Sequence, residues 1–190
     1  MNAKKLSFLL LILVAVACTN RSTSSEQDEM RHWNNVLQQI NALLLENKAR
    51  QTLDLAKQTL PEILESAEKN GTTDTLIYYA RKIFNACGNN YINTKQYKDG
   101  IDYMDSIGNH PLIREHCPHE LLSFKAGLNQ LYGNNPEAVR LAEDYLQLPV
   151  CTSANDFIRQ AEIISGVYMY SGNNLPKAIQ ILEKAIDVYR

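Results

Sequence analysis

Residues 76–107 constrain the fold of this chain more than any other segment. Large apolar and small residues recur there at three- and four-residue steps, which places them on one face of a helix. These positions are Cys87, Gly88, Tyr91, Tyr97, Gly100, Met104 and Ile107. A polar corner at Thr94, Lys95 and Gln96 interrupts the pattern. The segment therefore predicts two antiparallel helices, with small residues where the helices approach each other closely.

The same spacing returns twice further along the chain. In a third predicted hairpin the matching residues are Ala126, Gly133, Ala138, Ala142 and Tyr145. In a fourth they are Ile164, Ser165, Tyr168, Gly172, Ala178, Leu182 and Ala185. A first hairpin fits the pattern more loosely, through Thr52 and Ala56. The sequence therefore predicts an all-α chain of about eight helices in four antiparallel hairpins.

Caps and helix-breaking residues set the expected bounds of these helices. The predicted helices span residues 29–47, 50–70, 73–93, 97–107, 118–132, 136–148, 153–170 and 176–190. Pro61 lies inside the second of them and predicts a kink or a new helix start there. Residues 108–117 are expected to form a long irregular connection.

The pattern resembles the tetratricopeptide repeat, or TPR. In that family a small residue midway along the first helix precedes a Tyr, a corner Gly and a series of Ala residues. The resemblance covers residues 76–190, and residues 30–70 more weakly, and it implies a TPR-like solenoid. Gly100 in place of Ala, Asn129 in place of Tyr and a spacing of about 40 rather than 34 residues depart from the family pattern. An ordinary helical bundle is the alternative.

The N-terminus carries a targeting signal. Lys4 and Lys5 precede an apolar run at residues 6–17, which is shorter than the roughly 20 residues of a membrane span and typical of a secretory signal. The run ends Ala15-Val16-Ala17-Cys18, which resembles the signal of bacterial lipoproteins, where the Cys is acylated. Ordinary cleavage after Ala17, with Cys18 playing no part, is the alternative.

This resemblance implies a division of the chain into three parts. Residues 1–18 would be a lipoprotein-type signal peptide that ends at the lipidation site, Cys18. Residues 19–28 are polar and rich in Ser and Thr, which is typical of a flexible tether, and residues 29–190 would be the helical repeat domain. The protein is then expected in the bacterial cell envelope, anchored to a membrane by lipid and facing the periplasm.

Charge and cysteine content narrow the partners and the chemistry. The net charge is −2, so no basic field would attract nucleic acid. Apart from Cys18, the cysteines are Cys87, Cys117 and Cys151. Cys87 lies on an apolar helix face and is expected in the core, and a disulfide between Cys117 and Cys151 is left open.

No catalytic motif stands out, so we expect a non-enzymatic protein without a cofactor. The chain has no Gly-rich phosphate loop, nucleophile elbow or HExxH motif. The densest group of metal-ligand residue types is His110, His116, Cys117, His119 and Glu120. Its spacing matches no metal site that we recognise, and Cys117 to Glu120 is already explained as a helix start.

The candidate binding residues are Lys82, Asn85, Asn89 and Asn93. Their spacing puts them on one face of the predicted helix, which in TPR proteins lines the inner groove. An Asn amide both donates and accepts hydrogen bonds, so it suits a peptide backbone. The same face of later helices would present Ser123, Gln130, Glu162 and Tyr170. A merely solvated polar face is the alternative to a groove.

The last helix predicts a further contact surface. Ile179, Leu182, Ile186 and Tyr189 give it an apolar face with no following helix to cover it. A second copy, a partner or a downstream domain would cover that face.

Two functions follow as expectations. The first is a non-catalytic module that binds a protein or peptide on an envelope-anchored lipoprotein. The second comes from a resemblance to the periplasmic TPR region of sensor histidine kinases in Bacteroidetes. It would make the chain the N-terminal sensor region of a truncated signalling protein.

Overall fold

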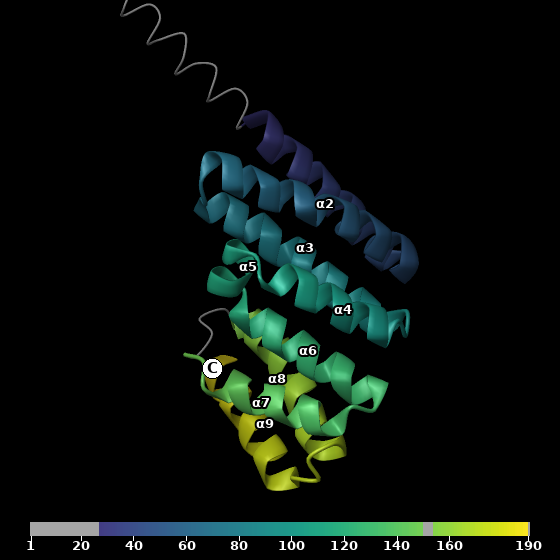
Figure 1. The fold of residues 1–190 in the computed structure, drawn as a ribbon, viewed down its shortest axis with the longest axis vertical. Coiled ribbons are helices and arrows are strands. Elements are labelled where there is room, and N and C mark those ends of the chain that lie inside the picture. The colour runs from purple at the N-terminus through teal and green to yellow at the C-terminus, as the bar shows by residue number, and fades with distance from the viewer. Residues whose placement is uncertain (1–26, 150–153, 190) are drawn as a thin grey trace, which may run out of the picture.

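The computed structural model describes residues 27–149 and 154–189, and every regular element in these ranges is a helix (Figure 1). Residues 27–45 form the first helix. The others are α2 (Ala49–Asn70), α3 (Asp74–Asn93), α4 (Tyr97–Gly108), α5 (Pro111–His116), α6 (Pro118–Tyr132), α7 (Asn135–Leu146), α8 (Ala154–Tyr170) and α9 (Leu175–Tyr189). The prediction of an all-α domain is confirmed, with nine helices in the described ranges.

The helices pack in pairs along the long axis of the molecule (Figure 1). Among helices α2 to α9, the most extensive packing joins α2 with α3, α6 with α7, and α8 with α9, while α6 also packs on α4 and α8. Two buried clusters meet at α6, because Phe124 and Leu128 belong to the cluster of the preceding helices and Ala126 to that of α7, α8 and α9. Helix α6 therefore ties the two halves of the core together.

Each of four corners between long helices holds one residue with positive φ. These residues are Asn47 (φ 56°), Lys95 (φ 58°), Gly133 (φ 95°) and Asn173 (φ 44°). In the first three corners a backbone N–H donates to the carbonyl five residues earlier, as at Gln96 to Tyr91. In the last corner the N–H of Asn174 donates to the carbonyl six residues earlier, at Tyr168, which accommodates one residue more between Tyr168 and Ala178 than between the matching Tyr91 and Gly100.

Small residues stand where helices cross closely, although the helix that Gly88 approaches is α6 of the next predicted hairpin and not α4. A Cβ atom added to Gly88 of α3 would lie 2.4 Å from the Phe124 ring of α6. One added to Gly100 of α4 would lie 3.0 Å from both Tyr91 and Leu128. Because real Cβ atoms do not approach other heavy atoms to 2.4 Å, glycine is what permits the crossing at Gly88. At Gly100 an added Cβ would be tight and would require its neighbours to shift.

The connection after α4 differs from the expectation. Residues 111–116 form the short helix α5 rather than irregular chain. Pro111 occupies its first turn, and the backbone N–H of Leu112 donates to Nδ1 of His110 at 3.2 Å. A six-residue helix is too short to show a periodic apolar face, which is why the sequence pattern did not reveal it.

Other local expectations stand or need small changes. Thr73 caps α3 by accepting a hydrogen bond from the N–H of Leu76, and Pro118 starts α6 as predicted. Helix α2 continues through Pro61 as one element, so no new helix starts there. Helix α7 begins at Asn135, one residue earlier than predicted, with Asn134 in the cap position.

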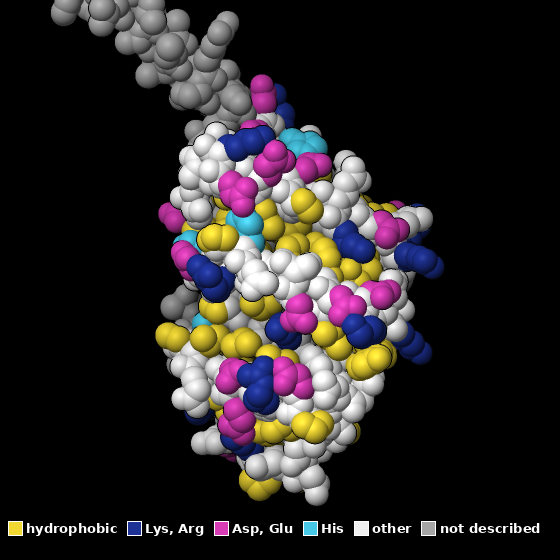
Figure 2. Space-filling view, viewed as in Figure 1, with side chains coloured by type: hydrophobic (Ala, Val, Ile, Leu, Met, Phe, Trp, Pro, Cys, Tyr) yellow, Lys and Arg dark blue, Asp and Glu magenta, His cyan; other side chains and the backbone are white. Residues whose placement is uncertain are grey.

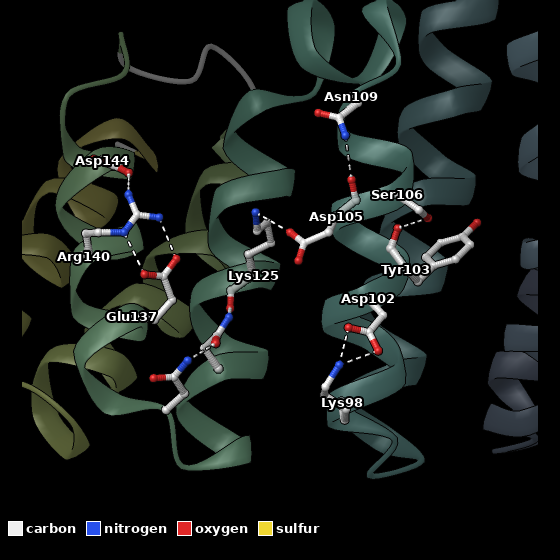
Figure 3. A network of polar contacts seen from close by, with 12 residues as sticks. Lys98, Asp102, Tyr103, Asp105, Ser106, Asn109, Lys125, Glu137, Arg140 and Asp144 are labelled. Atoms are coloured by element: carbon white, nitrogen blue, oxygen red, sulfur yellow. Dashed lines mark hydrogen bonds and ion pairs between the residues drawn. The ribbon is translucent and has the colours of Figure 1, made fainter.

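Ion pairs connect neighbouring helices at the surface and in the interior. Figure 3 shows Lys125 of α6 reaching Asp105 of α4, with 2.6 Å between the charged groups. Arg140 of α7 holds Glu137 and Asp144 of its own helix. In the interior, Glu120 is 2 % exposed and lies 3.2 Å from the guanidinium of Arg81, which joins α6 to α3. Burial makes this last pair sensitive to loss of either partner.

Two sequence predictions cannot be compared with the described residues. Cys18 and the tether up to residue 26 lie outside them, and so does Cys151, although Cys117 is buried. The lipid anchor and the disulfide therefore stay predictions. None of the described helices combines the length and the apolar character that crossing a membrane would require.

Candidate functional site

A polar ridge runs along one face of α3. Lys82, Asn85 and Asn89 follow one another at three- and four-residue steps on this helix. The opposite face, with Ile83, Phe84 and Cys87, is fully buried in the core. Because the buried face fixes how α3 is rotated, the ridge faces outward, with Lys82 exposed and the two Asn residues half-buried.

A larger hollow lies on one side of the ridge, between α3 and the first helix. Its volume is about 330 Å³. Leu37, Ile40 and Leu44 of the first helix give it an apolar wall. The α3 side adds Tyr78, which is 52 % exposed and whose ring centroid lies 5.8 Å from Nζ of Lys82. The hollow therefore combines an aliphatic wall with an aromatic ring, a cation and amides.

A buried amide with an unused acceptor also lines this hollow. The side chain of Asn90 is fully buried, and its Nδ2 donates to the carbonyl of Ala86 at 2.8 Å. Its Oδ1 has no hydrogen-bond partner among the described residues. A buried polar atom left without a partner is costly and calls for a reason.

A smaller hollow of about 180 Å³ lies on the other side of the ridge. It is formed by the ridge residues together with Phe124 of α6 and with Arg159, Gln160 and Ile163 of α8. The Nε of Arg159 donates to Oδ1 of Asn89 at 2.7 Å, across 70 residues of sequence. This bond links α8 to the ridge on α3.

The charge of these two hollows is positive. Lys82 and Arg159 supply it, and no carboxylate lines either hollow in the described part of the chain. On the face of the molecule seen in Figure 2, by contrast, acidic and basic side chains are interspersed. A local excess of cations in a concave surface favours ligands with carboxylate or carbonyl oxygens.

The structure brings three of the four predicted binding residues together. Lys82, Asn85 and Asn89 line both hollows, whereas Asn93 is exposed and lines neither. On α6, Ser123 is buried and donates to the carbonyl of Glu120. Ser123 is therefore not on an open face, contrary to the expectation.

Sequence reasoning missed Tyr78, Arg159 and the wall from the first helix. A signal for Arg159 was present in the repeat. It stands six residues before Ser165, and Lys82 stands six residues before Gly88, the matching small position of the earlier hairpin. The two cations thus hold equivalent places in two hairpins. The wall of the first helix carried no such signal, because that hairpin matches the pattern only loosely.

The His and Glu residues around α5, which are of metal-ligand type, each contact a different partner. The His110 ring faces Glu68 at 3.2 Å, Nε2 of His119 lies 2.6 Å from the carbonyl of Pro149, and Glu120 pairs with Arg81. Within the described ranges, no three His, Cys, Asp or Glu side chains lie where they could share a metal ion.

The thiol of Cys87 is held in its neutral form. Burial raises the pKa of Cys87 to about 12, and its Sγ lies 3.8 Å from the hydroxyl of Tyr103. Burial also raises the pKa of Tyr103. Because a thiolate is the reactive form of cysteine, Cys87 is a core residue rather than a nucleophile at neutral pH.

Comparison with protein-family models, with curated proteins and with solved structures found no match to this chain.

Proposed function

We propose that this chain is a non-catalytic module that binds a protein or peptide segment across the first helix, α3 and α8. The observation that carries the proposal is the ridge of Lys82, Asn85 and Asn89 with a hollow on each side. Amides that both donate and accept match a peptide backbone, and an apolar wall beside them takes side chains. The two cations attract acidic groups of the ligand.

We also propose that the helices form a TPR-like solenoid of four hairpins. The hairpins would be the first helix with α2, α3 with α4, α6 with α7, and α8 with α9. Two observations support this arrangement. Each hairpin corner has one residue with positive φ, and the two hollows are lined only by the first helix of each hairpin.

The proposed place of action is the bacterial cell envelope, with Cys18 acylated as the membrane anchor. This part rests on the sequence alone. Metabolic labelling with a fatty acid tests it, since a Cys18→Ser variant that is labelled as well as the wild type would overturn the anchor.

Partner capture tests the binding proposal. The whole chain, its Asn85→Ala/Asn89→Ala variant and an Asn109→Ala control are used to recover cross-linked partners from the source cells, with quantification by mass spectrometry. Asn109 is exposed at the end of α4 and lines neither hollow. We expect the wild type and the control to recover the same partner, and the double variant to lose most of it.

The contrary result is equally clear. If the double variant retains its fold by circular dichroism and recovers the same partners as the wild type, the ridge is a solvated surface and the proposal fails.

A further inference from the structure

Helix α9 leaves an apolar stripe exposed beside the side that is buried in the core. Its buried side is small and tightly packed, with Ala178, Ile181 and Ala185 all below 5 % exposure. A second row of apolar residues runs along the helix next to this buried side, at steps of four, three and four residues. It consists of Leu175 (55 % exposed), Ile179 (46 %), half-buried Leu182 and Ile186 (53 %).

The spacing of this second row is that of a helix-packing ridge. Residues three and four apart align along one side of a helix and fit the grooves of a facing helix. Among the described elements, α9 packs principally on α8. The stripe is therefore an open face of suitable shape for one more helix.

One flank of the stripe is acidic. Glu183 follows Leu182 and Asp187 follows Ile186, and at about 100° per residue both carboxylates lie on the same side of the stripe. Both are exposed, and neither has an ion-pair partner within the described residues. The cation between them in sequence, exposed Lys184, forms no ion pair with either among the described residues. Lys177, earlier on α9, is engaged by Glu143 of α7, at 2.5 Å.

This charge pattern selects among the occupants. A twofold antiparallel pairing of α9 with a second copy would set the two acidic flanks opposite each other, and like charges across an interface oppose association. A helix with Lys or Arg beside its apolar face would instead neutralise the flank as it covers the stripe.

We propose that α9 is a docking surface for a basic amphipathic helix of a partner protein. Leu175, Ile179, Leu182 and Ile186 receive its apolar face, and Glu183 and Asp187 receive its basic residues. The surface is separate from the ridge on α3, so it stands or falls independently of the function proposed above.

Designed peptides test this surface directly. The basic probe is a fluorescent helical peptide with Leu along one face and Lys on both flanks, and the matched peptide carries Glu in place of every Lys. Anisotropy titrations with the full chain are expected to show at least about tenfold tighter binding of the basic peptide, and a loss of that preference in high salt.

Variants locate the binding. The Ile179→Ser/Ile186→Ser substitution is expected to lower the affinity for the basic peptide about tenfold or more, because the apolar burial of both side chains on binding would be lost. Glu183→Lys/Asp187→Lys is expected to reverse the preference toward the acidic peptide. Two control variants should change neither the affinity for the basic peptide nor the preference for it. They are Leu45→Ser, at an 86 % exposed site on the first helix, and Asn85→Ala/Asn89→Ala. Circular dichroism checks that each variant is folded.

Three results would overturn the proposal. These are equal binding of the two peptides, unchanged binding after the Ile179→Ser/Ile186→Ser substitution, and a dimer in sedimentation experiments that the same substitution abolishes. The last result would assign the stripe to a second copy of the chain.

Discussion

At the scale of single residues, Gly88 decides how closely α3 and α6 approach. The Phe124 ring fills the space in which a side chain at Gly88 would lie. The repeat pattern predicted a close approach of two helices at this small residue, and the structure confirms a close approach there. It could not predict that Phe124 is the opposing residue, because this contact depends on how two hairpins pack.

Replacing Gly88 with Ala should destabilise the fold. Alanine favours helix by up to about 1 kcal/mol relative to glycine, but its Cβ would lie 2.4 Å from a ring that is 2 % exposed. Overpacking of a tight core costs about 1–3 kcal/mol, so we expect a net loss in the free energy of unfolding, measured by urea denaturation.

Gly166→Ala is the matched control. Gly166 also lies inside a helix, α8, but an added Cβ there would meet only Oε1 of Gln130, at 3.8 Å. This variant should be neutral or more stable. Equal effects of the two substitutions would show that helix propensity, and not the crossing with α6, governs Gly88.

At the scale of elements, caps and proline positions predicted most helix bounds, while contacts between elements needed the structure. One such contact holds α7, α8 and α9 together. Nζ of Lys177 lies 2.5 Å from Glu143 of α7 and 4.6 Å from the centroid of the Tyr168 ring of α8. Because the residues come from three helices, no periodicity within one helix could reveal the cluster.

The Glu143–Lys177 pair should make stability depend on pH. The hydrogen bond from Lys177 lowers the pKa of Glu143 below its ordinary value of 4.5. Because the pKa of Glu143 is lower in the folded chain than in the unfolded chain, its ionisation stabilises the fold at pH values above 4.5. This stabilisation is lost as the pH falls through the lowered pKa. Both side chains are partly exposed, so screening keeps the effect small.

Thermal unfolding of wild type and Glu143→Gln between about pH 7 and about pH 3 measures this effect. The wild type should have the higher Tm at neutral pH, and the difference should narrow below pH 4.5. Glu183→Gln serves as the control, since Glu183 has no ion pair among the described residues. If the difference in Tm between the wild type and Glu143→Gln stays constant with pH, the ion pair of Glu143 with Lys177 does not cause the pH dependence.

At the scale of the whole molecule, the sequence of one helix predicted the ridge, but it did not predict the residues of other helices that surround the ridge. The spacing of Lys82, Asn85 and Asn89 lies within α3, so sequence periodicity predicted that they share a face. Arg159 is 70 residues away from Asn89. The place of Arg159 can be predicted from the sequence only by aligning the second and fourth hairpins. The apolar wall of the first helix cannot be predicted in this way, because its position depends on how that helix packs on α3.

We propose that partners contact the ridge on α3. The most direct measurement is photo-crosslinking in the source cells, with p-benzoylphenylalanine placed at residue 85 and, as a control, at residue 109. Asn109 lies at the end of α4, as labelled in Figure 3. If partners contact the ridge, position 85 gives a discrete adduct and position 109 gives none. Adducts from position 109 alone, or the same adducts from both positions, would contradict this proposal.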